Sequence, residues 1–138
     1  MILLILACQA RADDWVGPAE AVDGTTLIIG KNRLRLAQIE PVDVLCERHY
    51  NVMPCGDFAR QTLARLIKDK QVTCSGASAD WHRVPRVNCR AGAVDLNRQM
   101  VLDGWAKADQ SNRYRAEQDL AMSRRDGFWM YDPYPSGK

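Results

Sequence analysis

The sequence is poor in the residues that build metal centres. It has two histidines and no pair of cysteines in the C-x-x-C spacing, which argues against a zinc site, because such sites normally take four of these ligands. It has no internal repeat and no low-complexity tract, which excludes a solenoid and a disordered linker. Its apolar runs are too short to cross a membrane as a helix, which takes about 20 residues. A net charge of +2 is too small to indicate nucleic-acid binding from overall electrostatics.

What the sequence contains is typical of one globular domain. Its 138 residues suffice for a sizeable core, and 46% of them are hydrophobic and 26% charged. The basic residues gather only in short clusters, such as Arg83, Arg86 and Arg90. Any basic face must therefore come from the way in which the fold brings such residues together.

The first twelve residues differ from the rest of the chain. A short apolar run (2–8) is followed by Ala-Arg-Ala (10–12), the small-x-small pattern that precedes a signal-peptidase cut. This pattern predicts export to the periplasm or secretion, with a lipoprotein modified at Cys8 as the alternative. The predicted organisation is an export signal (1–12) cleaved after Ala12, one domain (13–130) and a C-terminal tail (131–138).

Four cysteines remain once Cys8 is removed with the leader: Cys46, Cys55, Cys74 and Cys89. An even number in an exported protein indicates disulfides, and four cysteines allow three pairings. Cys74 and Cys89 fall in what read as neighbouring strands, while Cys46 and Cys55 bracket one loop. We therefore predict the local pairing, 46–55 and 74–89. Both loops are short, and chain entropy predicts about 3 kcal/mol of stabilisation from each bridge.

Hydrophobic periodicity and turn signals predict three strands, a helix, two strands and two helices. The predicted strands cover residues 15–23, 26–29, 34–39, 71–74 and 87–90, and the predicted helices cover 57–70, 95–102 and 111–126. Asp57 and Ser111 are expected to cap their helices, Gly127 to stop the last one, and residues 42–56 to form a loop. A five-stranded meander with a helix after the third strand is the layout of an OB-fold. We therefore expect an α+β protein, an OB-fold five-stranded β-barrel with three helices.

One stretch, residues 34–43 (LRLAQIEPVD), combines a cation with carboxylates at the end of a strand. Arg35 lies on the strand, and Glu40 and Asp43 flank the point where Pro41 ends it. An arginine and two carboxylates at this spacing can bring a phosphate and a metal ion together. The alternative is a surface arginine that forms ion pairs with surface acids.

Five stretches together resemble the staphylococcal-nuclease-like, or thermonuclease, family in its exported bacterial form, which the proposed cysteine pairs also resemble. They are residues 22–27 (VDGTTL), 34–43 (LRLAQIEPVD), 80–83 (DWHR), 95–106 (DLNRQMVLDGWA) and 127–129 (GFW). They cover nearly all of the mature chain in the order and spacing of that family. The resemblance implies a calcium-dependent phosphodiesterase, in which carboxylates hold Ca²⁺ and arginines stabilise the charge on phosphorus.

The resemblance also implies roles for single residues. Arg35 and Arg83 match the two arginines of the family, and Asp43 stands where the family has the carboxylate that activates water. Asp23 and Glu40 stand where the family has calcium ligands. The implied catalytic residues are therefore two arginines and one aspartate, beside a two-carboxylate metal site.

Four departures from the family pattern gather at this one site. Thr25 replaces a metal-binding carboxylate, and His82 replaces the glycine that precedes the second arginine. Glu40 is one methylene longer than its counterpart and Asp43 one shorter, which moves each carboxylate by about 1.5 Å. A displacement of that order can lower a rate about a hundredfold, so the pattern indicates a weakened or abandoned calcium site.

The sequence thus predicts an exported thermonuclease-fold protein whose calcium-dependent nuclease activity is impaired or lost. It would act as a binding or envelope-associated module, with nucleic acid, another phosphate-bearing ligand or an envelope protein as its partner. Trp81, next to His82 and Arg83, is a candidate for stacking on a base or sugar. The alternative is a working DNA or RNA endonuclease with Ca²⁺ as cofactor, since calcium accepts water in place of a lost ligand.

Overall fold

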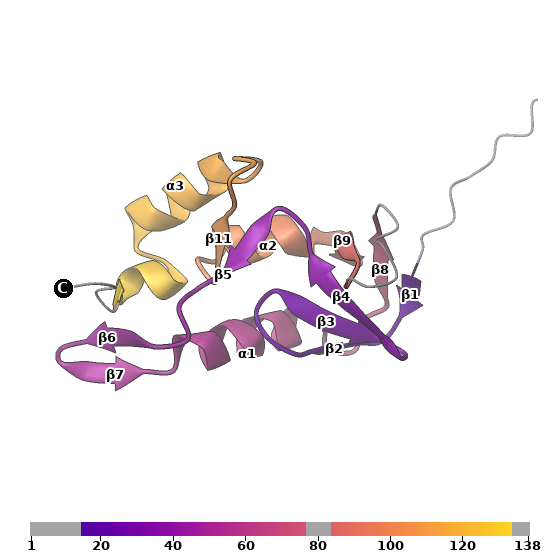
Figure 1. The fold of residues 1–138 in the computed structure, drawn as a ribbon, viewed down its shortest axis with the longest axis horizontal. Coiled ribbons are helices and arrows are strands. Elements are labelled where there is room, and N and C mark those ends of the chain that lie inside the picture. Colours follow the sequence, from indigo (N-terminus) through magenta and orange to yellow (C-terminus); the bar gives the residue numbers. More distant parts are fainter. Residues whose placement is uncertain (1–14, 77–83, 134–138) are drawn as a thin grey trace, which may run out of the picture.

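A mixed β-sheet and three α-helices make up the part of the chain that the structure, a computed structural model, describes (Figure 1). Residues 15–76 and 84–133 are described. The predicted α+β class is confirmed. The predicted export signal and Trp81, His82 and Arg83 lie outside the described residues. No helix among the described residues is long and apolar enough to span a membrane.

The main sheet has seven strands. They are β1 (Trp15–Gly17), β2 (Ala19–Ala21), β3 (Thr26–Ile29), β4 (Asn32–Leu36), β8 (Val72–Ser75), β9 (Arg86–Ala91) and β10 (Val94–Asp95). Two smaller sheets consist of β5 (Ile39–Pro41) with β11 (Ala106–Ala108), and of β6 (Cys46–Arg48), β7 (Asn51–Met53) and β12 (Asp132–Pro133). The helices are α1 (Cys55–Ile67), α2 (Leu96–Leu102), α3 (Arg115–Arg124) and the 3-10 helix η1 (Gly127–Met130).

The two ends of the main sheet are strands that follow each other in the chain. The hydrogen-bonded order is β1-β8-β9-β4-β3-β2, with β10 beside β9, and every pair is antiparallel except β4 with β9. Only Pro18 separates β1 from β2, so one bent segment supplies both edges. No ladder joins β1 to β2 in the described part, and the sheet is therefore not a closed barrel there.

Alternating side chains divide the sheet into an apolar and a polar face. On β9, Val87, Cys89 and Ala91 are buried while the residues between them are exposed, as a half-buried strand requires. On one face of α1, Ala59, Leu63 and Ile67 recur every four residues and are buried. A fully buried leucine of this kind contributes about 1.5–3 kcal/mol relative to an exposed one.

The buried side chain of Asn97 links helix α2 to two strands. Its Nδ2 donates to the carbonyl oxygens of Ala37 and Val87, at 3.0 Å each, and its Oδ1 accepts from the Cys89 backbone N–H at 3.0 Å. Asn97 is completely buried. One amide therefore bonds three backbone groups where the parallel pair β4–β9 ends, and the Val87 carbonyl among them also accepts from the Ala37 N–H at 2.8 Å.

Both predicted disulfides are confirmed, Cys46–Cys55 and Cys74–Cys89. Cys74 and Cys89 lie directly opposite each other in the β8–β9 ladder. The prediction of a loop over residues 42–56 was wrong, because this segment contains the β6–β7 hairpin. The first disulfide joins Cys46, at the start of β6, to Cys55, at the start of α1. Figure 1 shows this hairpin at the opposite end of the molecule from β1 and β8.

The hairpin turn consists of His49 and Tyr50, both with left-handed backbone angles (φ 50° and 66°). A two-residue turn with two positive φ values is the type I′ turn, which favours Asn-Gly. The sequence therefore carries no ordinary signal for it. Each non-glycine residue in this region costs on the order of 1 kcal/mol.

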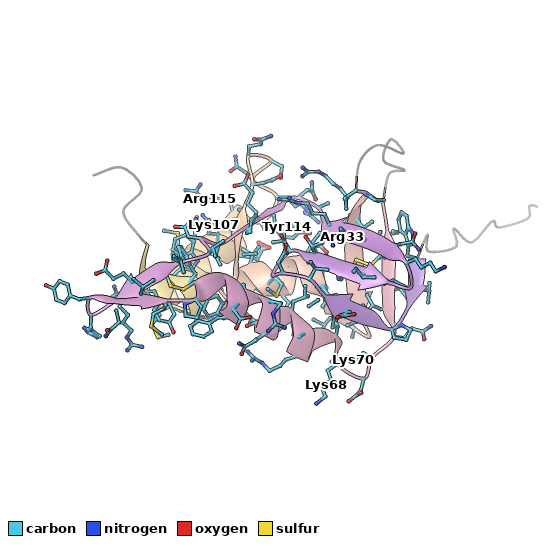
Figure 2. The ribbon with its side chains drawn as sticks, turned by 60° about the horizontal axis from the view of Figure 1, so that its bottom comes forward. Arg33, Lys68, Lys70, Lys107, Tyr114 and Arg115 are labelled. Carbon is cyan, nitrogen blue, oxygen red and sulfur yellow. A yellow bond between two sulfur atoms is a disulfide. The ribbon has the colours of Figure 1, made fainter. Side chains whose placement is uncertain are left out.

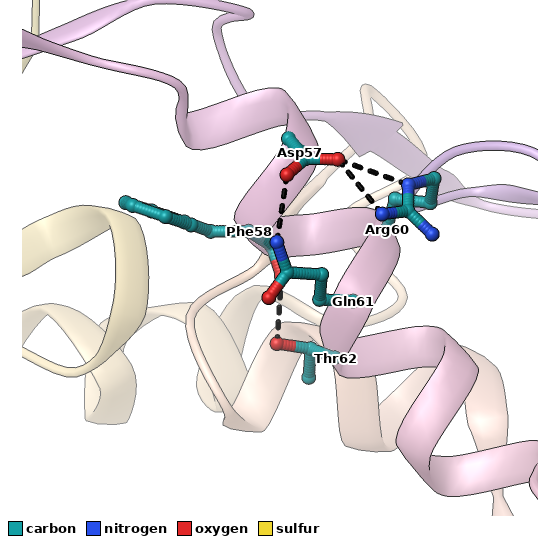
Figure 3. A network of polar contacts seen from close by, with 5 residues as sticks. All are labelled: Asp57, Phe58, Arg60, Gln61 and Thr62. Atoms are coloured by element: carbon teal, nitrogen blue, oxygen red, sulfur yellow. Dashed lines mark hydrogen bonds and ion pairs between the residues drawn. The ribbon is translucent and has the colours of Figure 1, made fainter.

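Helix α1 begins two residues earlier than predicted, and Asp57 does not cap it. Figure 3 shows the Asp57 carboxylate turned forward along the helix, where Oδ1 accepts from Arg60 (Nε at 3.0 Å, Nη2 at 2.9 Å) and Oδ2 from Gln61 at 2.7 Å. Pro54 occupies the N-cap position without a side-chain bond. The hydrogen bonds from Arg60, and then from Gln61, hold the pKa of Asp57 below its ordinary value of 3.8.

The ends predicted for the last helix were also wrong. Ser111 bonds to Asp109 through its N–H and hydroxyl, and α3 starts only at Arg115. The helix stops at Arg125, whose φ of 56° places it in the left-handed region, while Gly127 opens η1. The short helix predicted near Asp95 is confirmed, since the Asp95 side chain accepts from the Arg98 N–H.

Replacing Asn97 by alanine should lower the free energy of unfolding by roughly 2–4 kcal/mol, because the Ala37 carbonyl and the Cys89 N–H lose this partner and the Val87 carbonyl keeps only its bond from the Ala37 N–H. Urea denaturation of the oxidised protein measures this. Asn88→Ala is the control: Asn88 is exposed and meets Asn97 only at 3.4 Å, so its effect should stay within about 0.5 kcal/mol. Equal losses in the two variants would contradict the assigned role.

Asp57→Asn should reduce the acid sensitivity of the protein. A lowered folded pKa means that the carboxylate stabilises the fold above its unfolded pKa, and that this stabilisation disappears as pH falls through the folded pKa, below 3.8. Thermal unfolding near neutral pH and in this acidic range gives the comparison. The two proteins should differ near neutrality and converge in acid, and a pH-independent difference would contradict the assignment.

Candidate functional site

Arg35 lies in the middle of the main sheet, between strands β3 and β9. Its register partners are Thr26 on β3 and Arg86 on β9. Its side chain is half-buried, and its Nε is buried without a hydrogen-bond partner in the part of the chain that is described. An unpaired buried donor of this kind costs about 1–3 kcal/mol. The strands therefore hold a guanidinium ready for an acceptor.

The polar face of the sheet around Arg35 is rich in arginine. Arg33 lies two residues along β4, and Arg86 and Arg90 project from the exposed positions of β9. None of these four arginines forms an ion pair with a described carboxylate. Because Arg35 and Arg86 are direct cross-strand neighbours, their like charges oppose each other until an anion lies between them.

Asp23, predicted to bind calcium, directs its carboxylate into its own turn. Its Oδ1 accepts from the Thr25 backbone N–H at 2.8 Å and from the Thr25 hydroxyl at 3.2 Å. Thr25 is 1% exposed, so the position at which the resemblance implies a carboxylate is buried. Gly24 lies against α1, where a Cβ would overlap with the Cβ of Ala59. This turn is consequently fixed in place by its own contacts.

Asp43 forms an ion pair with Lys107, a residue that the sequence analysis did not single out, and Glu40 is the register partner of the same lysine. Lys107 lies on β11, directly opposite Glu40 on β5, and its Nζ is 3.2 Å from Asp43 Oδ1. The same ammonium lies 4.8 Å from the centre of the Phe128 ring. The alternation of small apolar and charged residues in Ala-Lys-Ala (106–108) could have predicted a short strand with an outward-facing lysine.

Lys107 and Arg33 occupy different parts of the molecule, and both are labelled in Figure 2. Lys107 accompanies the two carboxylates on the small β5–β11 sheet, whereas Arg33 belongs to the arginine face of the main sheet. Of the predicted site residues, Arg35 thus has no described carboxylate partner, whereas Asp43 is paired with the Lys107 ammonium.

The described residues do not fit a calcium ion. Ca²⁺ takes six to eight oxygen ligands at short distance, and no group of three or more His, Cys, Asp or Glu side chains lies close enough within residues 15–76 and 84–133. Asp23 is engaged by Thr25, and Asp43 by the Lys107 ammonium. A positive charge beside Asp43 opposes a divalent cation there.

A groove of about 630 Å³ lies elsewhere, between β2 and the C-terminal end of α1. Its lining includes Glu20, Arg60, Lys68 and Lys70, and none of the predicted site residues. Its two acidic and three basic side chains give no clear preference for an ion of either sign. The candidate site is therefore the arginine face.

Comparison with known proteins adds no relative, because no protein-family model matches the chain and no curated protein is significantly similar to it.

Lys107→Gln should lower the free energy of unfolding by about 1 kcal/mol. The partly exposed ion pair with Asp43 contributes about 0.2–1 kcal/mol, and the ring contact a similar amount. Urea denaturation of Lys107→Gln, Asp43→Asn and the double variant measures the coupling between the two groups. Lys31→Gln, an exposed lysine, should change nothing, and additive effects of Lys107→Gln and Asp43→Asn would rule out the ion pair.

Proposed function

We propose that this chain is an exported thermonuclease-fold protein that binds nucleic acid or another phosphate-bearing ligand on its arginine face, with calcium-dependent cleavage impaired or lost. The observation that carries the proposal is Arg35, with a buried Nε that lacks a described partner and with Arg86 directly beside it. A phosphate supplies both missing elements, hydrogen-bond acceptors and negative charge.

The geometry of guanidinium favours phosphate over other acceptors. Its N–H groups form a planar fork that fits two oxygens at once, and such charge-assisted bonds are about twice as strong as neutral ones. Neighbouring guanidiniums on adjacent strands suit successive phosphates of one strand of nucleic acid, or the two sides of a single phosphate. Arg33 and Arg90 extend the same face.

The strand order supports the finer assignment to an OB-fold. Counting the bent segment 15–21 as the first strand, β3, β4, β8 and β9 follow as the second to fifth, with α1 inserted after the third. The order β1-β8-β9-β4-β3-β2 and the parallel β4–β9 pair correspond to a partly open Greek-key barrel. The second and third strands of an OB-fold form its oligonucleotide-binding face, and here the third carries Arg33 and Arg35.

The state of the carboxylates supports binding over hydrolysis. Asp43, the expected partner of water, lies against the Lys107 ammonium, and Asp23 lies against Thr25. The alternative is a working endonuclease.

Two disulfides are compatible with export, because such bonds persist in oxidising compartments. Location in the periplasm or secretion remains part of the proposal.

Binding of a fluorescently labelled single-stranded oligothymidylate, followed by anisotropy in the presence of a chelator, tests the proposed function. Arg35→Gln should weaken binding about tenfold and reduce the salt dependence by about one phosphate contact. Arg115→Gln is the matched control, since this arginine is exposed on α3 and pairs with Asp119. Equal affinity in Arg35→Gln and the unaltered protein would contradict the proposal.

Cleavage of heat-denatured DNA, with calcium and with chelator, distinguishes the alternative. We expect no cleavage by the unaltered protein. Calcium-dependent cleavage by the unaltered protein that disappears in Arg35→Ala would contradict the proposal that nuclease activity is lost. A Thr25→Asp, Lys107→Gln double variant restores one carboxylate and removes the competing cation, and calcium-dependent activity in this variant alone would locate the lost function there.

A further inference from the structure

A second group of cations surrounds a hollow of about 320 Å³ that the proposed function does not use. Its lining is Arg48 and His49 from the β6–β7 hairpin, Arg125 from the end of α3, and Met130 from η1. Figure 1 shows the hairpin and the short helix near the C-terminal end of the described chain, away from β1 and β8. Two separate segments of the chain thus bring three nitrogen-bearing side chains together.

Arg48 is held in place by contacts that leave its charge available. Its guanidinium lies 5.9 Å from the centre of the Tyr131 ring, and its Nη1 is 3.7 Å from the sulfur of Met130. Neither a ring nor a thioether neutralises a guanidinium. The adjacent Glu47 points to the other face of β6, because neighbours on a strand alternate. Neither Arg48 nor Arg125 forms an ion pair with a described residue.

Two of the four lining residues have backbone angles that their side chains disfavour. His49 (φ 50°) and Arg125 (φ 56°) lie in the left-handed region, where glycine or asparagine is preferred. Other non-glycine residues share this backbone region without lining the hollow, namely Gln38, Tyr50, Asp69 and Asn112. The site is therefore inferred from the charges around the hollow. At His49 and Arg125, the disfavoured residue is the one that places a donor group at the hollow.

We propose that this hollow is a second anion site, which binds a small organic phosphate. Arg48 and Arg125 supply guanidinium forks from two sides, the His49 imidazole supplies a further donor, and Met130 supplies an apolar wall for the organic part. The volume suits a ligand of this size, since small-molecule sites begin at about 300 Å³. The site is independent of the arginine face, with which it shares no residue.

The test is a titration of the ¹⁵N-labelled, oxidised protein with phenyl phosphate, followed by two-dimensional NMR. Amide signals of residues 48–50 and 125–127 should shift and saturate. Inorganic phosphate should shift the same signals more weakly, and phenol should leave them in place, which separates the phosphate from the ring. Arg48→Gln should weaken the binding of phenyl phosphate about tenfold.

Arg125→Gly separates binding from folding. It removes a guanidinium and relieves the left-handed backbone, so it should raise the melting temperature and weaken phenyl phosphate binding about tenfold. Asn112→Gly is the matched control, because Asn112 has the same left-handed backbone (φ 58°) away from the hollow. Because asparagine tolerates this backbone, the control should change the melting temperature little and leave the affinity for phenyl phosphate unchanged.

Three results would overturn the proposal. The first is an unchanged affinity in both Arg48→Gln and Arg125→Gly. The second is a set of shifts that spread over all arginines without saturation. The third is loss of the hairpin shifts in Arg35→Gln, which would show that the hollow is no separate site. If phenyl phosphate still shifts the hairpin amide signals in Arg35→Gln, the second site is supported, even if the protein does not bind the oligonucleotide.

Discussion

The buried amide of Asn97 is the constraint on which the arrangement of the sheet depends. Parallel strands need a partner for the backbone groups that their ladder leaves unpaired, and here β4 and β9 leave such groups at the Ala37 carbonyl and the Cys89 N–H. One side chain from α2 bonds both of them and also the Val87 carbonyl, which already accepts from the Ala37 N–H, and it fixes the helix against both strands. Arg35 lies on the same short parallel pair, so the position of the candidate site follows from this buried contact.

Charge is segregated on this molecule in a way that its small net charge conceals. The carboxylates nearest to the predicted site are engaged by a neighbouring ammonium and a threonine, whereas the arginines of the sheet have no described carboxylate partner. Fixed positive charge without compensating acid favours anions and opposes divalent cations. The arginines of the sheet thus have no described carboxylate partner, while Asp43 is paired with Lys107 and Asp23 with Thr25, a distribution of charge consistent with the proposed binding of a phosphate.

Local signals predicted the parts of the fold that local chemistry determines. The strand before Gly30, the helix capped by Asp95 and the pairing of Cys74 with Cys89 all follow from residues close in sequence. The β6–β7 turn was missed because His49 and Tyr50 adopt left-handed angles without glycine. Lys107 was missed because its place opposite Glu40 depends on the pairing of strands more than sixty residues apart. The surroundings of Arg35, whose Nε has no partner among the described residues, depend on three strands at once.

A close crossing of two backbone segments lies between Lys107 and the hollow beside the β6–β7 hairpin. Gly104 and Gly127 both have positive φ, and a Cβ on Gly104 would overlap with the carbonyl oxygen of Asp126. The Phe128 N–H donates to the Gly104 carbonyl oxygen at 2.8 Å across this contact. The crossing places the Phe128 ring beside the Lys107 ammonium and joins the end of α3 to η1, the two elements that line one side of the hollow. Only glycine permits this approach, so the two glycines connect the Lys107–Asp43 ion pair with the arginines of the proposed second anion site.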